Sequence, residues 1–193
     1  MSGSAAEERI RAKAEAALRE VYPDARIIHE LMLRQGGCRI DLAAVTESRL
    51  ITVEIKSERD VLARLKEQAR QAREVSDGFY VVLAEPHWRK AWEDDHVSIL
   101  EAVKEDEIVA DLRRGQRGVM TAWCNAPARL AMLWADELRW IAGQKGARHF
   151  CITAASDAQT GSQIRRAVCA ALRARPFPRA DPAIPVHVLE QAA

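Results

Sequence analysis

The stretch that decides the fold is Arg49-Leu50-Ile51-Thr52-Val53-Glu54-Ile55-Lys56. Its β-branched residues favour a strand, and successive side chains of a strand point to opposite faces of the sheet. Glu54 and Lys56 are therefore predicted to share one face, with Ile55 buried behind them. An acid and a base placed in this way suit a divalent cation beside an activated water molecule, which is an arrangement for phosphodiester hydrolysis.

A second acid, Asp41, lies thirteen residues before Glu54 in the apolar run 38–45. Asp is disfavoured in strands, so a charge at this place needs a reason. Clustered carboxylates repel each other, and a divalent cation removes that repulsion. Mg²⁺ prefers oxygen ligands, which Asp41, Glu54 and the Ile55 carbonyl offer. Lys56 would orient the attacking water and offset negative charge that grows on the phosphate.

Glu30 is the third candidate acid. It lies in the alternating segment 26–33, and Gly36-Gly37 after this segment indicates a tight hairpin. If the turn centres on the two glycines, Glu30 lies across from Asp41 or Leu42 and joins the acidic cluster. A slip of one residue in the register would turn it to the other face.

The elements around these strands predict an α/β fold with a mixed central sheet flanked by helices. A helix is expected from Ala5 to about Val21, and Asp60 is expected to cap a helix that ends near Val75. The apolar run 79–84 reads as a buried strand, and because a crossover helix precedes it, we expect it to pair parallel to a core strand. The predicted order over residues 1–85 is αβββαβ.

The second half of the chain is predicted to be mainly helical. Residues 96–103 and 107–112 are interpreted as two strands, with one helix over 100–112 as the alternative, and residues 115–118 as a linker. Apolar residues at helical spacing predict helices over 128–143 and 162–175, and the Pro-rich ends of 176–193 predict an irregular tail. These features divide the chain into a core, residues 1–117, and a small helical extension, residues 118–193.

Composition restricts the class of protein. The 193 residues carry a net charge of +1, and no apolar run is long enough to span a membrane. The acidic N-terminus does not resemble a secretory signal, and four cysteines without metal spacing indicate reduced thiols, so we expect a cytoplasmic protein without membrane contact. Residues 113–193 hold 12 Lys and Arg against 5 Asp and Glu, which makes them the better candidate for a polyanion contact.

The acids and the lysine, in this order of elements, resemble the PD-(D/E)XK nuclease superfamily, whose core is the restriction-endonuclease-like fold. Residues 54–68 are similar to a group of uncharacterised bacterial and phage members with the pattern E-I-K-S-x-x-D-x-L-x-R-L-x-x-Q. The likeness covers roughly residues 5–175. It includes three further segments: Glu30-Leu31, Arg39-Ile40-Asp41 and Leu133-Trp134-Ala135-Asp136-Glu137-Leu138.

The resemblance implies a role for several residues. Asp41 and Glu54 would hold Mg²⁺, for which Mn²⁺ can substitute, and Lys56 would be the catalytic lysine. Ser57 and Gln68 would support the site or touch phosphate. Related nucleases often place Tyr four residues after this Gln, whereas Ala72 stands here. Several branches also carry an acid in the first helix, for which Glu7 and Glu8 are candidates beside Glu30.

The predicted function is Mg²⁺-dependent hydrolysis of DNA phosphodiester bonds. Arg64, with other basic residues of the crossover helix, either forms a solvated face or follows a phosphate backbone. A homodimer is one of the assemblies that the resemblance allows. Two alternatives share the scaffold: a non-catalytic module that binds nucleic acid or protein, and a ribonuclease.

Overall fold

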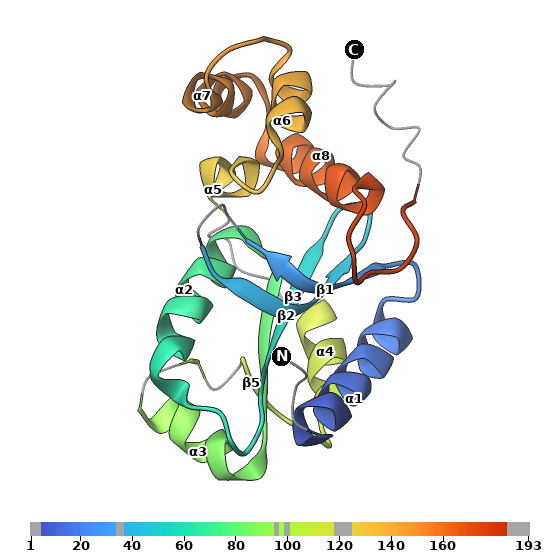
Figure 1. Ribbon diagram of the computed structural model, residues 1–193, viewed down its shortest axis with the longest axis vertical. Helices are drawn as coiled ribbons and strands as arrows, with labels where there is room; N and C mark the ends of the chain where they lie inside the picture. The colour runs from blue at the N-terminus through green and yellow to red at the C-terminus, as the bar shows by residue number, and fades with distance from the viewer. Residues whose placement is uncertain (1–4, 34–36, 95–96, 99–100, 118–124, 185–193) are drawn as a thin grey trace.

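The central feature is a mixed β-sheet, which a computed structural model shows with helices on both faces (Figure 1). The structure describes residues 5–33, 37–94, 97–98, 101–117 and 125–184. Within these residues the sheet has five strands in the order β1-β2-β3-β4-β5. Their bounds are Arg26–Met32 (β1), Arg39–Val45 (β2), Leu50–Lys56 (β3), Gly78–Leu83 (β4) and Ala102–Lys104 (β5).

The pairing of the strands follows from their connections. β1, β2 and β3 are joined without a crossover and pair antiparallel. The 3₁₀ turn η1 (Leu62–Arg64) and helix α2 (Leu65–Val75) separate β3 from β4, and these two strands pair parallel. β5 extends the sheet parallel to β4. The predicted α/β class with a mixed sheet is confirmed.

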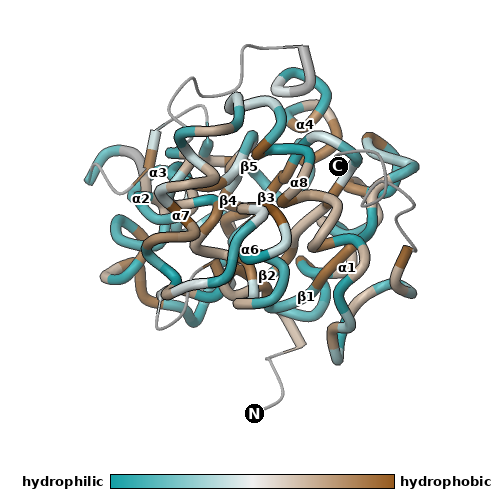
Figure 2. The backbone as a smooth tube through the Cα atoms, turned by 90° about the horizontal axis from the view of Figure 1, so that it is seen from above, coloured by the Kyte–Doolittle hydropathy of each residue, from teal (hydrophilic) through white to brown (hydrophobic). Residues whose placement is uncertain are grey.

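The two faces of the sheet are covered by different helices. Helices α1 (Ala5–Val21) and α4 (Ile108–Arg117) bury one face, where Ile51 and Val53 of β3 meet Leu18 and Leu112. Helix α2 and the C-terminal helices bury the other face. Seen from above, the strands lie between α1 on one side and α2 and α3 on the other (Figure 2). The remaining helices are α3 (Glu85–Glu93), α5 (Ala126–Leu130), α6 (Ala135–Ala142), α7 (Arg148–Ala158) and α8 (Gly161–Ala174).

Residues 85–117 differ from their prediction. The expected strand 107–112 is wrong, because these residues belong to helix α4 apart from Glu107. The alternative of one helix over 100–112 is also wrong, since strand β5 comes first. Of the strand expected over 96–103, only its last two residues belong to β5, while 96 and 99–100 lie outside the described residues.

Residues 115–117, predicted to be part of a linker, belong to α4. The packing of α4 against the sheet explains the glycine at position 115. A Cβ placed on Gly115 would lie 1.6 Å from the hydroxyl oxygen of Tyr80 on β4. Glycine is therefore the residue that lets α4 approach the sheet this closely.

The C-terminal helices confirm the predictions in part. Helix α8 is present with Ile164, Val168 and Leu172 buried. The helix expected over 128–143 is interrupted, and α5 and α6 replace it. Helix α7 was not predicted.

Residues 179–181 cover the outer edge of the sheet along β1. The amide of His29 donates to the carbonyl of Arg179 at 2.8 Å, and the amide of Asp181 donates to that of Ile27 at 2.9 Å. These bonds satisfy an edge strand that would otherwise be open to pairing with another chain. The tail, predicted to be irregular, is thus hydrogen-bonded to β1 over these residues, while 185–193 lie outside the described residues. No helix in the described part of the chain is long and apolar enough to cross a membrane.

Candidate functional site

The site begins where strands β2 and β3 separate. Their register runs from Val45↔Leu50 to Leu42↔Val53. Beyond this pair the Asp41 carboxylate is the hydrogen-bond acceptor on β2, since its Oδ2 accepts a hydrogen bond from the amide of Ile55 at 2.8 Å. A side chain therefore replaces the backbone acceptor at the fork. This contact explains why an acid is placed in an apolar strand, and it brings Asp41 next to Glu54.

The neighbouring strand changes course at the same level. Glu30 has a φ of 56°, which is uncommon outside glycine and strained for this side chain. In a regular strand, residues three apart point to opposite faces of the sheet. On β1, however, Ile28 and Leu31 pack into the same hydrophobic cluster, so the alternation of side chains between the two faces shifts by one residue at Glu30. The observed pairs of β1 and β2 place Glu30 level with Asp41, as one of the two predicted registers does.

Glu54 and Lys56 lie on one face of β3, as strand alternation predicts. The Lys56 Nζ donates to Glu54 Oε1 at 2.7 Å and to the amide oxygen of Gln68 at 3.1 Å. Gln68, on α2, also donates through Nε2 to Glu54 Oε1. These contacts form a closed triangle in which Lys56 is only 8 % exposed. A buried lysine with two fixed acceptors has a well-defined orientation.

The second oxygen of Glu54 is the unusual atom of the site. Glu54 is 3 % exposed, and its Oε2 is buried without a hydrogen-bond partner among the described residues. Burial raises the pKa of Glu54 to about 7, and the charge of Asp41 adds to the effect, while Lys56 and Gln68 oppose it. A buried carboxylate oxygen without a hydrogen-bond partner lowers the stability of the folded state unless another group binds to it.

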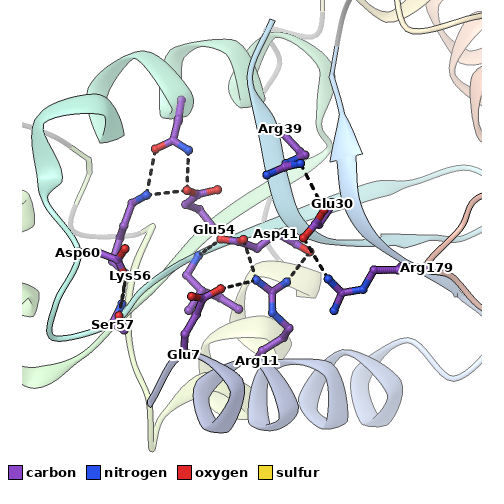
Figure 3. Close-up of polar contacts among 12 residues, drawn as sticks. Glu7, Arg11, Glu30, Arg39, Asp41, Glu54, Lys56, Ser57, Asp60 and Arg179 are labelled. Carbon is purple, nitrogen blue, oxygen red and sulfur yellow. Dashed lines mark hydrogen bonds and ion pairs between the residues drawn. The ribbon is translucent and has the colours of Figure 1, made fainter. Parts of the chain in front are cut away.

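Arg11 is a site residue that the sequence analysis missed. From α1 its Nη2 donates to Asp41 Oδ1 at 2.9 Å and to Glu7 Oε1 at 2.8 Å, and its Nη1 donates to the Asp41 carbonyl at 3.0 Å (Figure 3). The spacing of Glu7 and Arg11 by four residues predicts that they pair on one helix face. Nothing in that spacing indicates that the pair reaches β2.

Glu30 is held by two arginines. Its carboxylate contacts Arg39 at 3.3 Å and Arg179 at 3.0 Å, and both arginines are more than half exposed (Figure 3). No group of three or more His, Cys, Asp or Glu side chains in the described residues is arranged to hold a metal ion. The structure thus brings Asp41 and Glu54 together without Glu30 as a third member.

The other predicted substrate contacts are placed differently. Ser57 donates through its amide and hydroxyl to Asp60 Oδ2, at 2.7 Å and 2.6 Å. Asp60 therefore closes a turn after β3 and does not cap the next helix, which corrects its predicted role. Arg64 precedes α2 with its side chain exposed, and no hydrogen bond or ion pair of the described residues joins it to Glu54 or Lys56.

A cavity of about 290 Å³ opens at the ends of β4 and β5. Leu83 in its wall is the register partner of Lys56, so the cavity adjoins the strand end that carries the lysine. Glu105 in the wall binds Lys13 at 2.6 Å and Arg9 at 3.2 Å. The lining holds three acids and two lysines, so its formal charge is close to balanced. The lining residues are Lys13, Leu83, Glu85, Lys104, Glu105 and Asp106.

Fold and site together define an α/β protein with a buried acid–lysine group at a strand fork. A family model described as Bacteriophage P4 protein cII matches residues 3–181, and the chain belongs to this family. Comparison with curated proteins and with solved structures finds no match.

Proposed function

We propose that the protein is a Mg²⁺-dependent nuclease that hydrolyses DNA phosphodiester bonds, as a member of the PD-(D/E)XK superfamily. The observation that carries the proposal is the buried Oε2 of Glu54, which lacks a partner in the described residues beside a second carboxylate, Asp41. A lysine fixed at 2.7 Å from the same glutamate supports it.

The donors present fit a magnesium ion. Mg²⁺ is commonly bound by one or two carboxylates, with water and substrate phosphate in the remaining positions, so a third acid is not required. Asp41 and Glu54 would hold the ion, and the Ile55 carbonyl is a further candidate ligand. When bound, the ion would supply Lewis-acid stabilisation of the charge on the phosphate.

Lys56 would act on the attacking water. Its ammonium group has three N–H donors, of which Glu54 and Gln68 accept two among the described residues. The third donor would hold a water or a phosphate oxygen. Attack of a water oxygen on phosphorus would form the new P–O bond of the 5′-phosphate and release one proton to solvent, while the bond to the 3′ oxygen breaks and that oxygen takes up a proton from solvent as the 3′-hydroxyl. Gln68 keeps the lysine and the glutamate in register during the step.

The approach of DNA is expected from the side of Glu30. There Arg39 and Arg179 are exposed and can follow phosphates, whereas the cavity near Lys56 is lined by acids and lysines together. Arg64 is a further candidate on the rim of α2.

The first prediction tests catalysis directly. Asp41→Asn and Lys56→Ala should each reduce cleavage by at least about 10²-fold, because each removes a group that acts on the reacting phosphate. Full-length protein is incubated with Mg²⁺ or Mn²⁺ and labelled single-stranded, duplex, flap and branched oligonucleotides, with a parallel RNA substrate. Lys90→Ala, an exposed lysine on α3, is the matched control. Wild-type activity in either site variant would refute the assignment.

One observation favours the alternative of a non-catalytic binding module. The Asp41 carboxylate already has a counter-charge in Arg11, at 2.9 Å. Under this alternative the full-length protein binds DNA with no divalent cation and cleaves none of the substrates. Binding of DNA without cleavage in the presence of either Mg²⁺ or Mn²⁺ would favour the non-catalytic binding module.

A further inference from the structure

Arg11 is bound to Asp41, one of the two acids assigned to the divalent cation under the proposed function. Its guanidinium contacts both the carboxylate Oδ1 and the backbone carbonyl of Asp41, at 2.9 Å and 3.0 Å. The other oxygen, Oδ2, accepts the Ile55 amide. The Arg11 side chain is only 12 % exposed, so this contact is poorly screened by water. Asp41 is therefore satisfied by a cation that belongs to the chain itself.

Glu54 is in the opposite state. Its Oε1 accepts hydrogen bonds from Lys56 and Gln68, whereas its buried Oε2 has no partner in the described part of the chain. Both carboxylate oxygens of Asp41 thus accept hydrogen bonds, whereas Glu54 has one oxygen without a partner among the described residues. A cation held by both acids would therefore have to displace an existing contact at Asp41, but none at the Oε2 of Glu54.

Glu7 offers Arg11 a second partner outside that contact. Its Oε1 lies 2.8 Å from Arg11 Nη2, one helical turn away on α1, and its side chain is 28 % exposed. If the guanidinium leaves Asp41, the pair with Glu7 remains available toward solvent. Release of Asp41 therefore does not leave a buried arginine without a counter-charge.

We propose that Arg11 is an intramolecular competitor of the divalent cation at Asp41. The inference rests on the proposed function, because it presumes a cation site at Asp41 and Glu54. A guanidinium and a divalent ion repel each other strongly at one poorly solvated carboxylate oxygen, so the two occupy it in turn. Cation binding releases Arg11 from Asp41 while its pair with Glu7 remains, and loss of the cation restores the contact with Asp41.

The second prediction measures this competition. Binding of Mn²⁺ to the full-length chain is followed by titration calorimetry and by the electron paramagnetic resonance signal of free Mn²⁺. Arg11→Met keeps the length of the side chain and removes its charge, and it should bind Mn²⁺ about tenfold tighter than the wild type, a usual size for coupling between two ligands. Arg19→Met is the control, since Arg19 also pairs four residues back on α1 but lies on Glu15 and Asp181.

Glu7→Gln provides an independent arm with the opposite sign. Without its second partner Arg11 stays on Asp41, so Mn²⁺ binding should weaken. In the Arg11→Met background the same Glu7→Gln change should have no effect, because the competitor is gone. Should Arg11→Met fail to fold by circular dichroism, weaker Mn²⁺ binding in Glu7→Gln still tests the competition.

The outcomes separate this inference from the proposed function. Wild-type binding of Mn²⁺ that is lost in Asp41→Asn, together with unchanged or weaker binding in Arg11→Met, overturns the competition and leaves the cation site intact. Absence of Mn²⁺ binding in both the wild type and Arg11→Met overturns both proposals. If Arg11→Met does not fold, unchanged binding of Mn²⁺ in Glu7→Gln overturns the competition.

Discussion

Glu54 shows how one buried residue links stability to pH. Its pKa is raised from an ordinary 4.5 to about 7, chiefly by burial. The folded state therefore binds a proton more tightly than the unfolded chain does. The contribution of this proton to stability is complete below pH 4.5 and disappears as the pH rises through about 7.

The third prediction concerns this pH dependence. Glu54→Gln cannot titrate, so it should remove a fall in the free energy of unfolding between pH 5 and pH 8 that the wild type shows. The shift from 4.5 to about 7 corresponds to about 3 kcal/mol. Urea denaturation at several pH values in the absence of divalent ions measures it. Glu47→Gln, whose side chain is 90 % exposed, is the control. Identical slopes in the wild type and Glu54→Gln would contradict the prediction.

Residues within one strand were predicted well, and contacts between distant elements were not. The alternation of β3 places Glu54 and Lys56 on one face, and an acid in an apolar run marked Asp41. The contact of Arg11 with Asp41 could not be predicted, because it depends on how α1 crosses the sheet, and no local sequence pattern encodes that crossing. The turn through Ser57 and Asp60 was missed because an Asp before a helix also suits a cap.

At the scale of elements, a buried ion pair joins the crossover helix region to the C-terminal helices. Asp77, between α2 and β4, contacts Arg129 of α5 at 2.8 Å, with side chains 7 % and 3 % exposed. The other carboxylate oxygen of Asp77 accepts the Leu50 amide at 2.8 Å. Arg165 of α8 adds a contact at 3.3 Å. One carboxylate thus connects the sheet to two helices of the extension.

The fourth prediction is that this pair contributes far more to stability than an exposed one. Arg129→Met leaves the Asp77 charge buried with a weaker partner, and it should lower the free energy of unfolding by about 3 kcal/mol. Arg139→Met breaks an exposed pair with Asp136 on α6, whose side chain is 95 % exposed, and should change it by less than about 0.5 kcal/mol. Urea denaturation of both variants provides the comparison. Equal effects would show that burial does not govern the pair.

Long-range arginines also explain why the helix expected over 128–143 is interrupted. Arg148 donates to the carbonyls of Ala131 and Leu133, and Arg175 donates to that of Met132. Arg175 also lies 4.5 Å from the ring of Trp134, the residue before α6. These donors satisfy carbonyls that a continuous helix would bond internally. The periodicity of the segment predicted a helix correctly, but the break is specified by residues far along the chain.

At the scale of the molecule, the C-terminal helices complete the hydrophobic core of the sheet. Leu130, Leu133, Val168 and Leu172 belong to the same cluster as Val45 of β2. Arg26 of β1, itself 2 % exposed, donates to the carbonyls at the end of α8, and residues 179–181 lie along β1. The division at residue 117 remains a prediction from sequence, and the shared cluster indicates that the two parts depend on each other.

The fifth prediction follows from this dependence. A chain of residues 1–117 exposes the sheet face that α5 to α8 cover, and burial of apolar surface is the main source of stability in a domain of this size. We expect this fragment to lose its cooperative thermal transition and to bind a hydrophobic dye, while the full chain shows one transition by circular dichroism and by tryptophan fluorescence. Co-expression with residues 125–184 should restore part of the transition, because it returns the covering helices. A fragment 1–117 that unfolds cooperatively near the full-length Tm would instead establish the core as an independent domain, and would make the helical part an accessory to a site whose residues Asp41, Glu54 and Lys56 all lie within the first 117.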